Sequence, residues 1–291
     1  MDINSKSLNN TAVVLVSHGS SLPFAEKVFE DIKEKFIAKT GMAAEIGYMK
    51  VSHPTIAEAV DILKDGNDDL EKIIALPVFL AEGIHTNIDI PILLGLKPLE
   101  VDPRCPDGNY PEEHYLSVGG KADFEGEIIL LSPIGADDRL LDIIDKRISE
   151  AGVSDKTGVV LVTHGSRLNY NKEFADELYD KFSRKCDLAS THGFMELCGP
   201  SIPEAIGDLT SKNDLDSLVV VPVFIAPGMH TTHDIPHILG LAEEHHHHHH
   251  HHDHEHDLTP IDFEGEIRYP DPIGADDILI DILVSKVLEA I

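Results

Sequence analysis

The chain has 291 residues, of which 42% are hydrophobic, so it can form one large domain or two ordinary ones around a proper core. Its 23 basic and 52 acidic side chains give a net charge of −29, which argues against binding to nucleic acid or to an anionic membrane. No stretch approaches the ~20 apolar residues that span a bilayer, so we expect a cytoplasmic protein. Cys105, Cys186 and Cys198 form no CxxC pair, which excludes a disulfide framework and a cysteine zinc site.

The first predicted element is a strand, "AVVLVS", which is short, continuous and rich in β-branched residues. Such runs are typical of strands buried on both faces of a sheet. A helix follows from Pro23, and further strands are predicted at Glu45–Met49, Ile73–Leu80 and Ile128–Leu131. This alternation of strands and helices predicts an α/β domain with a mainly parallel sheet of about four strands.

The whole pattern then occurs a second time. "TAVVLVSHGS" at Thr11–Ser20 matches "TGVVLVTHGS" at Thr157–Ser166, and "PIGADDRLLDII" from Pro133 matches "PIGADDILIDIL" from Pro272. A period near 146 residues is too long for a solenoid repeat, so we infer two fused copies of one domain. The predicted copies are residues 1–152 and 153–291, joined within Ala151–Gly158.

Polar residues follow the predicted strands at the same places in both copies. His18 and His164 come after the first strand, and His85 and His230 come after the third. Ligands of open α/β sheets bind beyond the carboxyl ends of the strands, so each histidine pair is expected to line one crevice. Neutral imidazole binds first-row divalent metals and accepts protons near pH 7. The alternative for a single histidine beside glycine is a purely structural turn.

The second strands end differently in the two copies. "MKVSHP" in the first copy stands against "MELCGP" in the second, so Lys50 takes the place of Glu196 and His53 that of Gly199. Glu196 is therefore the candidate proton acceptor, and the second copy is predicted to carry more of the chemistry. Lys50 is expected to bind an anionic group in the first copy.

The loop after the third strand raises two further expectations. Asp89 and Asp234 lie four residues after His85 and His230, and we expect them to cap the helix that follows. The alternative is that each carboxylate holds its imidazole in place. Glycine after His18 and His164 is expected to let another group approach the backbone closely. The loops also differ, because Ile88 and Ile92 of the first copy become His233 and His237 in the second.

The HGS triplet after the first strand and the pattern H-x3-D-I-P-x3-G-L after the third resemble the CbiX-type class II chelatases. These enzymes insert cobalt or nickel into sirohydrochlorin, for cobalamin or coenzyme F430. The resemblance covers almost the whole chain, once in each copy. Short members of the family are single domains that form homodimers, whereas long members carry two such domains in one chain. This chain resembles the long members. The "PIGADD" endings resemble archaeal members.

The resemblance implies a fold of two tandem chelatase-like three-layer αβα domains. It implies that His18 and His85 in the first copy, and His164 and His230 in the second, handle the metal. It also implies an intramolecular pseudo-dimer that acts as a monomer, with no cofactor beyond the substrate metal. Some long members carry a C-terminal cysteine cluster for an iron–sulfur centre, and this chain has no such cluster.

Sirohydrochlorin carries eight carboxylates, and hydroxyl and basic groups near the HGS loops are candidates to bind them. These candidate substrate-binding residues are Ser20, Ser21, Lys50, Ser166 and Arg167. Two other functions stay open: a ferrochelatase acting on the same ring for siroheme, and a protein that stores or escorts nickel or cobalt without turnover.

Residues 245–256 form a histidine tract, "HHHHHHHHDHEH", that contains ten of the chain's 19 histidines. It is internal and mixed with acidic residues, so we expect a native, exposed and disordered loop. Such tracts bind Ni²⁺, Co²⁺, Cu²⁺ and Zn²⁺ with little discrimination, which predicts a role in storing or relaying metal. The alternative is a spacer with no role.

Overall fold

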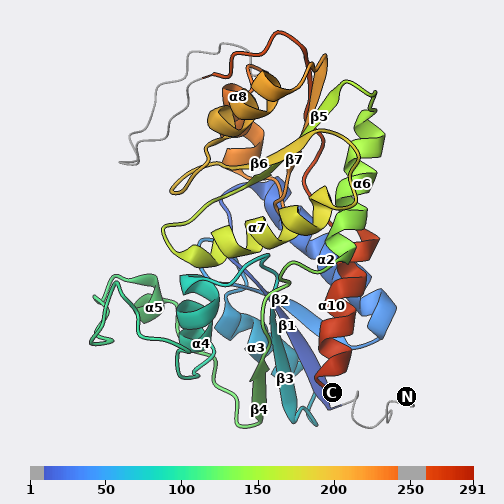
Figure 1. The fold of residues 1–291 in the computed structure, drawn as a ribbon. Coiled ribbons are helices and arrows are strands. Elements are labelled where there is room, and N and C mark those ends of the chain that lie inside the picture. The colour runs from blue at the N-terminus through green and yellow to red at the C-terminus, as the bar shows by residue number, and fades with distance from the viewer. Residues whose placement is uncertain (1–9, 242–259) are drawn as a thin grey trace. The chain divides into compact units, whose positions relative to one another are not determined.

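The computed structural model describes residues 10–241 and 260–291, and these form two compact units (Figure 1). The first unit comprises Met1–Asp137 together with Ala275–Ile291, and the second comprises Asp138–Gly274. Each unit contains one four-stranded parallel sheet, with strand order β2-β1-β3-β4 in the first and β6-β5-β7-β8 in the second. The predicted α/β fold, with about four parallel strands in each copy, is confirmed.

The elements of the first unit are β1 (Thr11–Ser17), α2 (Pro23–Thr40), β2 (Ala43–Tyr48), α3 (Ile56–Asp65), β3 (Lys72–Pro77), the π-helix η1 (His85–Asp89), α4 (Ile90–Leu93), α5 (Tyr115–Val118), β4 (Glu127–Leu130) and α10 (Asp277–Glu289). The elements of the second unit are α6 (Arg139–Ala151), β5 (Thr157–Thr163), α7 (Asn169–Ser183), β6 (Ser190–Phe194), α8 (Ile202–Lys212), β7 (Ser217–Pro222), the π-helix η2 (His230–Asp234), α9 (Ile235–Ile238) and β8 (Glu266–Arg268).

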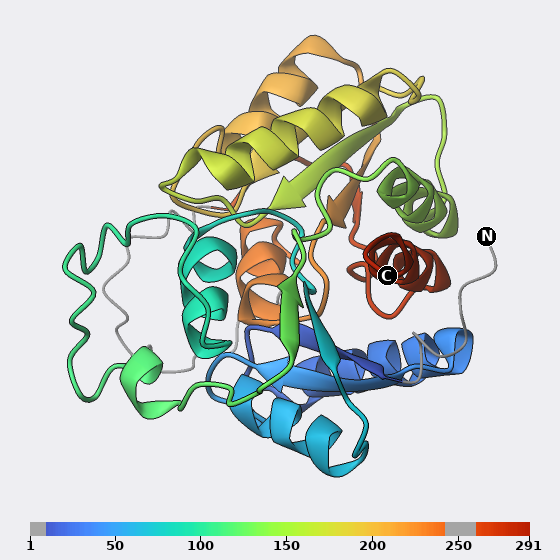
Figure 2. The same ribbon diagram turned by 90° about the horizontal axis from the view of Figure 1, so that it is seen from below.

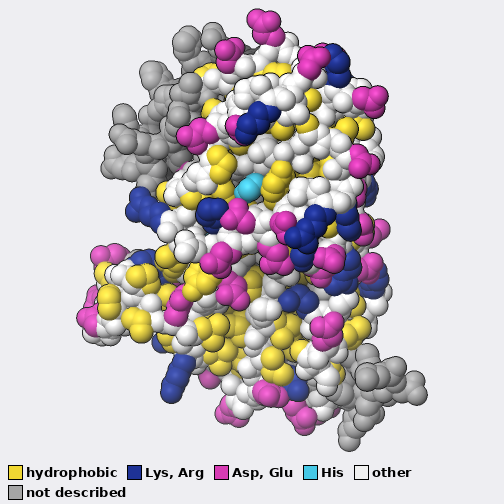
Figure 3. Space-filling view, in the orientation of Figure 1, with side chains coloured by type: hydrophobic (Ala, Val, Ile, Leu, Met, Phe, Trp, Pro, Cys, Tyr) yellow, Lys and Arg dark blue, Asp and Glu magenta, His cyan; other side chains and the backbone are white. Residues whose placement is uncertain are grey.

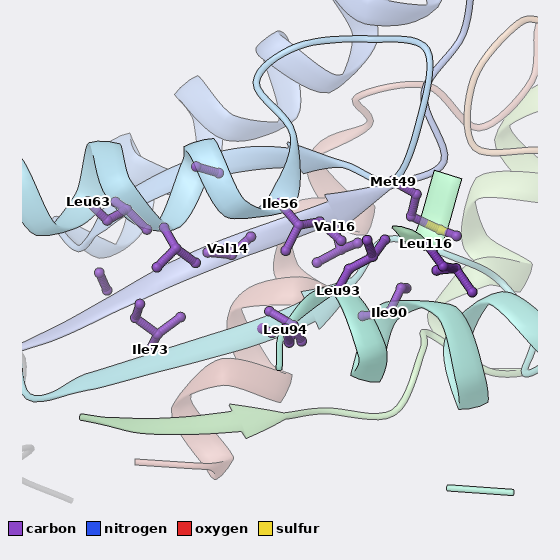
Figure 4. Close-up of a cluster of buried hydrophobic side chains, with 14 residues drawn as sticks. Val14, Val16, Met49, Ile56, Leu63, Ile73, Ile90, Leu93, Leu94 and Leu116 are labelled. Carbon is purple, nitrogen blue, oxygen red and sulfur yellow. The ribbon is translucent and has the colours of Figure 1, made fainter. Parts of the chain in front are cut away.

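One hydrophobic cluster of the first unit lies between its sheet and the helices α3 and α4 (Figure 4). Val14 and Val16 of β1 point to the same face of the sheet because side chains alternate along a strand, and they pack there with Ile56 of α3 and Leu93 of α4. A capping box fixes the start of α3, since the Thr55 side chain accepts a hydrogen bond from the backbone N–H of Glu58 and the Glu58 side chain accepts one from Thr55. Packing on this face fixes the position of α4, and with it that of the loop before it.

The last helix of each repeat belongs to the unit built by the other repeat. In the first unit, α10 (red in Figure 2) packs against α2 (blue) and β3, and Lys35 Nζ lies 2.7 Å from Asp277 Oδ1. In the second unit, α6 packs against β7 and α7, and the Arg147 guanidinium donates to the carbonyl oxygen of Ile273 at 2.9 Å. The two repeats of the sequence have therefore exchanged one helix in forming the two units.

Acidic side chains are spread over the face of the molecule shown in Figure 3, with lysine and arginine side chains among them. That distribution is typical of a solvated acidic surface. Among the helices that the structure describes, none is long and apolar enough to cross a membrane.

Because of the exchange, we expect residues 1–152 and 153–291, produced as separate chains in one cell, to purify as a complex. Each fragment supplies the helix that covers the sheet of the other, and a fragment alone would leave the apolar residues of that helix in water. Affinity purification through a tag on one fragment, followed by size-exclusion chromatography, measures this. Removing both exchanged helices, Arg139–Ala151 from the first fragment and Asp277–Glu289 from the second, is the control and should abolish the complex. Two fragments that each unfold cooperatively as independent monomers would contradict the exchange.

Candidate metal site

The ends of the first and second strands touch in each unit, at the glycine that follows the histidine. A Cβ atom on Gly165 would lie 1.9 Å from the carbonyl oxygen of Glu196, and one on Gly19 would lie 1.8 Å from that of Lys50. Both glycines also have φ of +90°, a conformation that L side chains rarely adopt. The predicted close approach is therefore present, and the approaching group is the backbone of the residue at the end of the second strand.

A tight turn follows that residue in each unit. The backbone N–H of Cys198 donates to the carbonyl oxygen of Glu196 at 2.8 Å, and Leu197 between them has φ of 65°. Val51 has φ of 70° in the equivalent turn after Lys50. A γ-turn of this hand costs about 1–3 kcal/mol for a non-glycine residue and persists only where its surroundings hold it. The turn ends the second strand abruptly and keeps Glu196 beside the HGS loop.

Three potential metal ligands converge in the second unit. Ligand atoms of His164, Glu196 and His230 all lie within 4.8 Å of one another, and no other such group of three His, Cys, Asp or Glu occurs among the residues described. Nε2 of His164 lies 3.4 Å from Oε1 of Glu196, and the two imidazole rings are 4.8 Å apart. The Glu196 side chain is only 14% exposed, whereas that of His164 is 42% exposed. The site is thus open to solvent on its histidine side.

Both imidazoles are oriented by a hydrogen bond at Nδ1. Nδ1 of His164 lies 3.0 Å from the carbonyl oxygen of Gly165, and Nδ1 of His230 lies 2.8 Å from Oδ2 of Asp234. Both partners accept hydrogen bonds, so the Nδ1 atoms carry the protons and each Nε2 keeps its lone pair for a metal. Two nitrogens and one carboxylate suit a first-row divalent cation and leave positions for exchange.

The helix-capping role expected for Asp89 and Asp234 is wrong. Neither side chain makes a capping hydrogen bond at the start of α4 or α9, because each carboxylate instead holds the imidazole four residues earlier. The hydrogen bond that His230 donates to Asp234, with a smaller contribution from the charge of Glu196, raises the pKa of His230 above its usual value. Burial raises the pKa of Asp234, but the hydrogen bonds from His230 and His233 outweigh it and leave that pKa lowered.

The first unit repeats the histidine pair without the carboxylate. The His18 and His85 rings are 5.0 Å apart, and Nδ1 of His18 lies 3.0 Å from the carbonyl oxygen of Gly19. Burial, together with the smaller effects of the nearby charges of Lys50 and His85, lowers the pKa of His18 to about 4. Burial also lowers the pKa of Lys50. An ammonium group in the place of Glu196 repels a cation, so this site suits an anion better than a metal ion.

Three residues that the sequence did not single out complete the first site. The buried Asp89 accepts hydrogen bonds from Nδ1 of His85 at 2.6 Å and from the Tyr115 hydroxyl at 2.5 Å, and it pairs with the Arg104 guanidinium. Asp102 holds Arg104 from its other side at 2.8 Å. These residues lie in the long excursion between α4 and β4 (Figures 1 and 2). Aligning the two repeats could not reveal them, because the excursion has no matching sequence in the second repeat.

The predicted substrate-binding serines and arginine lie in or beside the HGS loops. The Ser20 hydroxyl accepts from the backbone N–H of Leu22 at 3.1 Å, and Ser166 does the same with Leu168. These bonds hold the turn before the helix and leave each hydroxyl hydrogen free to donate. Ser21 and Arg167 are exposed.

The CbiX family model matches residues 12–151 and again residues 158–290. The chain belongs to the CbiX family. The resemblance seen in its motifs is thereby confirmed, as are the two repeats. The predicted enzyme class agrees with the curated relatives, which are named as chelatases.

A protein named sirohydrochlorin cobaltochelatase from Methanothermobacter thermautotrophicus is 45% identical over 146 residues, which are 49% of this chain and 99% of that protein. One of the same name from Methanopyrus kandleri is 44% identical over 138 residues, 46% of this chain and 96% of that protein. The solved structure of SirB from Bacillus subtilis with Fe3+ covers 96% of this chain and 95% of its own, with a TM-score of 0.68. At 18% identity that likeness concerns the fold alone.

Exchanging the residues at the ends of the second strands should move the metal site. Glu196→Lys should abolish one equivalent of Ni²⁺ or Co²⁺ binding, because it replaces an anionic ligand by a cation. Lys50→Glu should add one equivalent by completing a triad with His18 and His85. Equilibrium dialysis measures both, in full-length chains whose tract histidines are changed to glutamine. Lys50→Gln is the matched control and should add none; equal stoichiometry in all chains would refute the assignment.

We expect His18 to stay neutral as the pH falls to about 4, because burial and Lys50 both oppose its protonation. Its pKa is lower in the folded chain than in the unfolded one, so His18 stabilises the fold fully above pH ~6.5, and that contribution declines as the pH falls towards the folded pKa. NMR titration of the His18 imidazole measures the pKa directly. Lys50→Gln should raise it, and a pKa near 6.5 in the parent chain would contradict the environment described.

Proposed function

We propose that this protein is a sirohydrochlorin chelatase that inserts Co²⁺ or Ni²⁺ into the ring, for cobalamin or coenzyme F430. The observation that carries the proposal is the convergence of His164, Glu196 and His230 at the strand ends of the second unit. Family membership and the names of the methanogen relatives support the same reaction. One chain holds both repeats, so we propose that it acts as a monomer without a resident cofactor.

In the proposed reaction, the substrate metal binds Nε2 of His164 and of His230 together with the Glu196 carboxylate. Asp234 and the carbonyl of Gly165 keep the two Nδ1 protons, so neither ring has to change its tautomer when the metal arrives or leaves. Only three protein ligands hold the ion, and two of the side chains are partly exposed. Ring nitrogens can therefore replace the protein ligands one at a time.

Insertion also requires the loss of two protons from the pyrrole nitrogens. Glu196 is the proposed acceptor, because its carboxylate lies beside the imidazole of His164 at the end of β6. When the metal moves into the ring, the carboxylate and the Nε2 atoms lose their cation and become available for the released protons. The same three side chains, those of His164, Glu196 and His230, are thus proposed to bind the metal first and to accept the released protons afterwards.

The first unit is proposed to bind carboxylates of the ring. Lys50 supplies a partly buried ammonium group whose Nζ lies 5.3 Å from the centroid of the Tyr115 ring and whose charge acts on His18. Arg104 neutralises Asp89, so this carboxylate does not repel an anion at Lys50. The serine hydroxyls of the HGS loops, with Ser21 and Arg167, are further proposed contacts for the carboxylates.

Ferrochelation for siroheme is the near alternative, since ligands of this kind do not by themselves select one first-row metal. A storage or escort protein is the alternative of a different class. Mixing the purified protein anaerobically with sirohydrochlorin and Co²⁺, Ni²⁺ or Fe²⁺ in turn, and following the ring absorption, distinguishes the three. The metal that is inserted at the highest rate, at equal free concentration, identifies the activity. Tight metal binding without any acceleration over the uncatalysed rate would indicate storage.

The two units should contribute unequally to turnover. Glu196→Gln should lower kcat by about 10²–10⁴-fold, the usual cost of losing an acid–base group, because the amide cannot accept a proton. His164→Ala or His230→Ala should cost far more than His18→Ala or His85→Ala. Steady-state rates under saturating Co²⁺ measure this, with Lys50→Gln as the matched control for charge at the equivalent strand end. Equal losses from the four histidine variants, together with a neutral Glu196→Gln, would refute the division.

A further inference from the structure

Two histidines of the second unit lie next to the triad but take no part in it. His233 is in η2 and His237 is in α9, and the side chains of both are exposed. The first unit has Ile88 and Ile92 at the same places, where Ile88 is fully buried and Ile92 packs against the core. The two imidazoles therefore do not replace the isoleucines as core residues, and their polar chemistry faces the solvent.

His233 shares a carboxylate with the triad. Asp234 accepts from Nδ1 of His230 through Oδ2 at 2.8 Å and from Nδ1 of His233 through Oδ1 at 3.0 Å. Each imidazole thus has its proton on Nδ1 and a lone pair on Nε2, the arrangement that favours binding a metal. In the first unit the corresponding oxygen of Asp89 pairs with Arg104 instead. Beside this aspartate oxygen the second unit therefore has an imidazole, which can bind a metal, whereas the first unit has a guanidinium cation.

His237 provides the second ligand. It follows His233 by four residues within the helical segment that runs from His230 to Ile238. Side chains four residues apart in a helix lie on the same face, with Cβ atoms about 5–6 Å apart. Two histidines at that spacing can chelate one metal ion, as in the paired histidines of helical zinc sites. The negative charge of the whole chain, −29, also concentrates divalent cations at its surface.

We propose that His233 and His237 form a second divalent-metal site on the exposed face of η2 and α9, which captures Ni²⁺ or Co²⁺ and passes it to His164, Glu196 and His230. The 58% exposed side chain of His233 meets the solvent, while that of His230 is 32% exposed and belongs to the triad. Transfer requires only the exchange of imidazole ligands on either side of Asp234. The capture site stands on its own geometry, whereas the transfer step rests on the proposed function.

Metal stoichiometry tests the capture site. The probe is Ni²⁺ or Co²⁺ alone, titrated into the full-length chain whose ten tract histidines are changed to glutamine, with a competing chelator present. We expect two equivalents per chain, and His237→Gln should remove one of them. That substitution leaves both hydrogen bonds of Asp234 intact. His53→Gln, an exposed histidine of the first unit, is the matched control and should change nothing. A single equivalent, or two that survive His237→Gln, would overturn the site.

A complementary variant identifies which equivalent was lost. Glu196→Lys should abolish the triad equivalent and keep the one that depends on His237, and the ligand-field absorption of Co²⁺ should separate the two. Loss of both equivalents in Glu196→Lys would mean that His237 belongs to one enlarged site, which contradicts the proposal.

Kinetics then tests the transfer. His237→Gln should raise the Co²⁺ concentration that gives the half-maximal rate several-fold, with kcat kept, because capture limits the rate only when metal is scarce. An unchanged half-maximal concentration, or a loss of kcat, would overturn the transfer step. If no chain turns over sirohydrochlorin with any metal, the proposed function fails, while the stoichiometry still decides the capture site.

Discussion

The geometry of the site depends on one close contact, between Gly165 and the carbonyl oxygen of Glu196. A side chain at Gly165 would overlap that oxygen, so only glycine lets the ends of β5 and β6 come together. The backbone N–H of Glu196 also donates to the carbonyl of His164 at 3.0 Å, which ties the two residues directly. A carboxylate and an imidazole that lie 32 residues apart in the chain are thereby brought within 3.4 Å of each other. The first unit has the same contact at Gly19 and places Lys50 there instead.

The aspartate that lies four residues after each loop histidine occupies the same place in both units but has different surroundings. Asp89 and Asp234 both accept a hydrogen bond from Nδ1 of the histidine four residues earlier. Asp89 is completely buried and its charge is balanced by Arg104, whereas Asp234 is partly exposed and holds a second histidine. Burying a carboxylate requires such a balance, because an unpaired charge inside a protein is strongly destabilising. The same aspartate is therefore paired with a guanidinium group in the first unit and with a second imidazole in the second unit.

A duplicated domain with exchanged helices can diverge in this way without losing its fold. The residues that form each sheet and bury its faces are of the same kind in both units, and α10 and α6 occupy equivalent places. Among the residues that the structure describes, the differences near the two histidine pairs lie at the strand ends, in the helical segments that follow the loop histidines, and in the excursion that carries Arg104 and Tyr115. Loops at the ends of a rigid sheet tolerate such change because they contribute little to the core.

The sequence by itself determined the α/β class, the duplication and the four histidines at the strand ends. Those features follow from local rules: β-branched runs form buried strands, and a repeated order of motifs repeats a fold. It also predicted that Glu196 and Lys50 distinguish the two sites, because both follow a recognisable strand. The tertiary structure decided which side chains that are distant in the sequence come into contact. It assigned Asp89 and Asp234 to the imidazoles, although an aspartate before a helix satisfies the sequence rule for a cap equally well. It brought Arg104 and Tyr115 to Asp89, and it gave each unit the last helix of the other repeat. Hydrogen bonds and packing between distant residues depend on distances in space, and neither spacing nor periodicity along the chain encodes those distances.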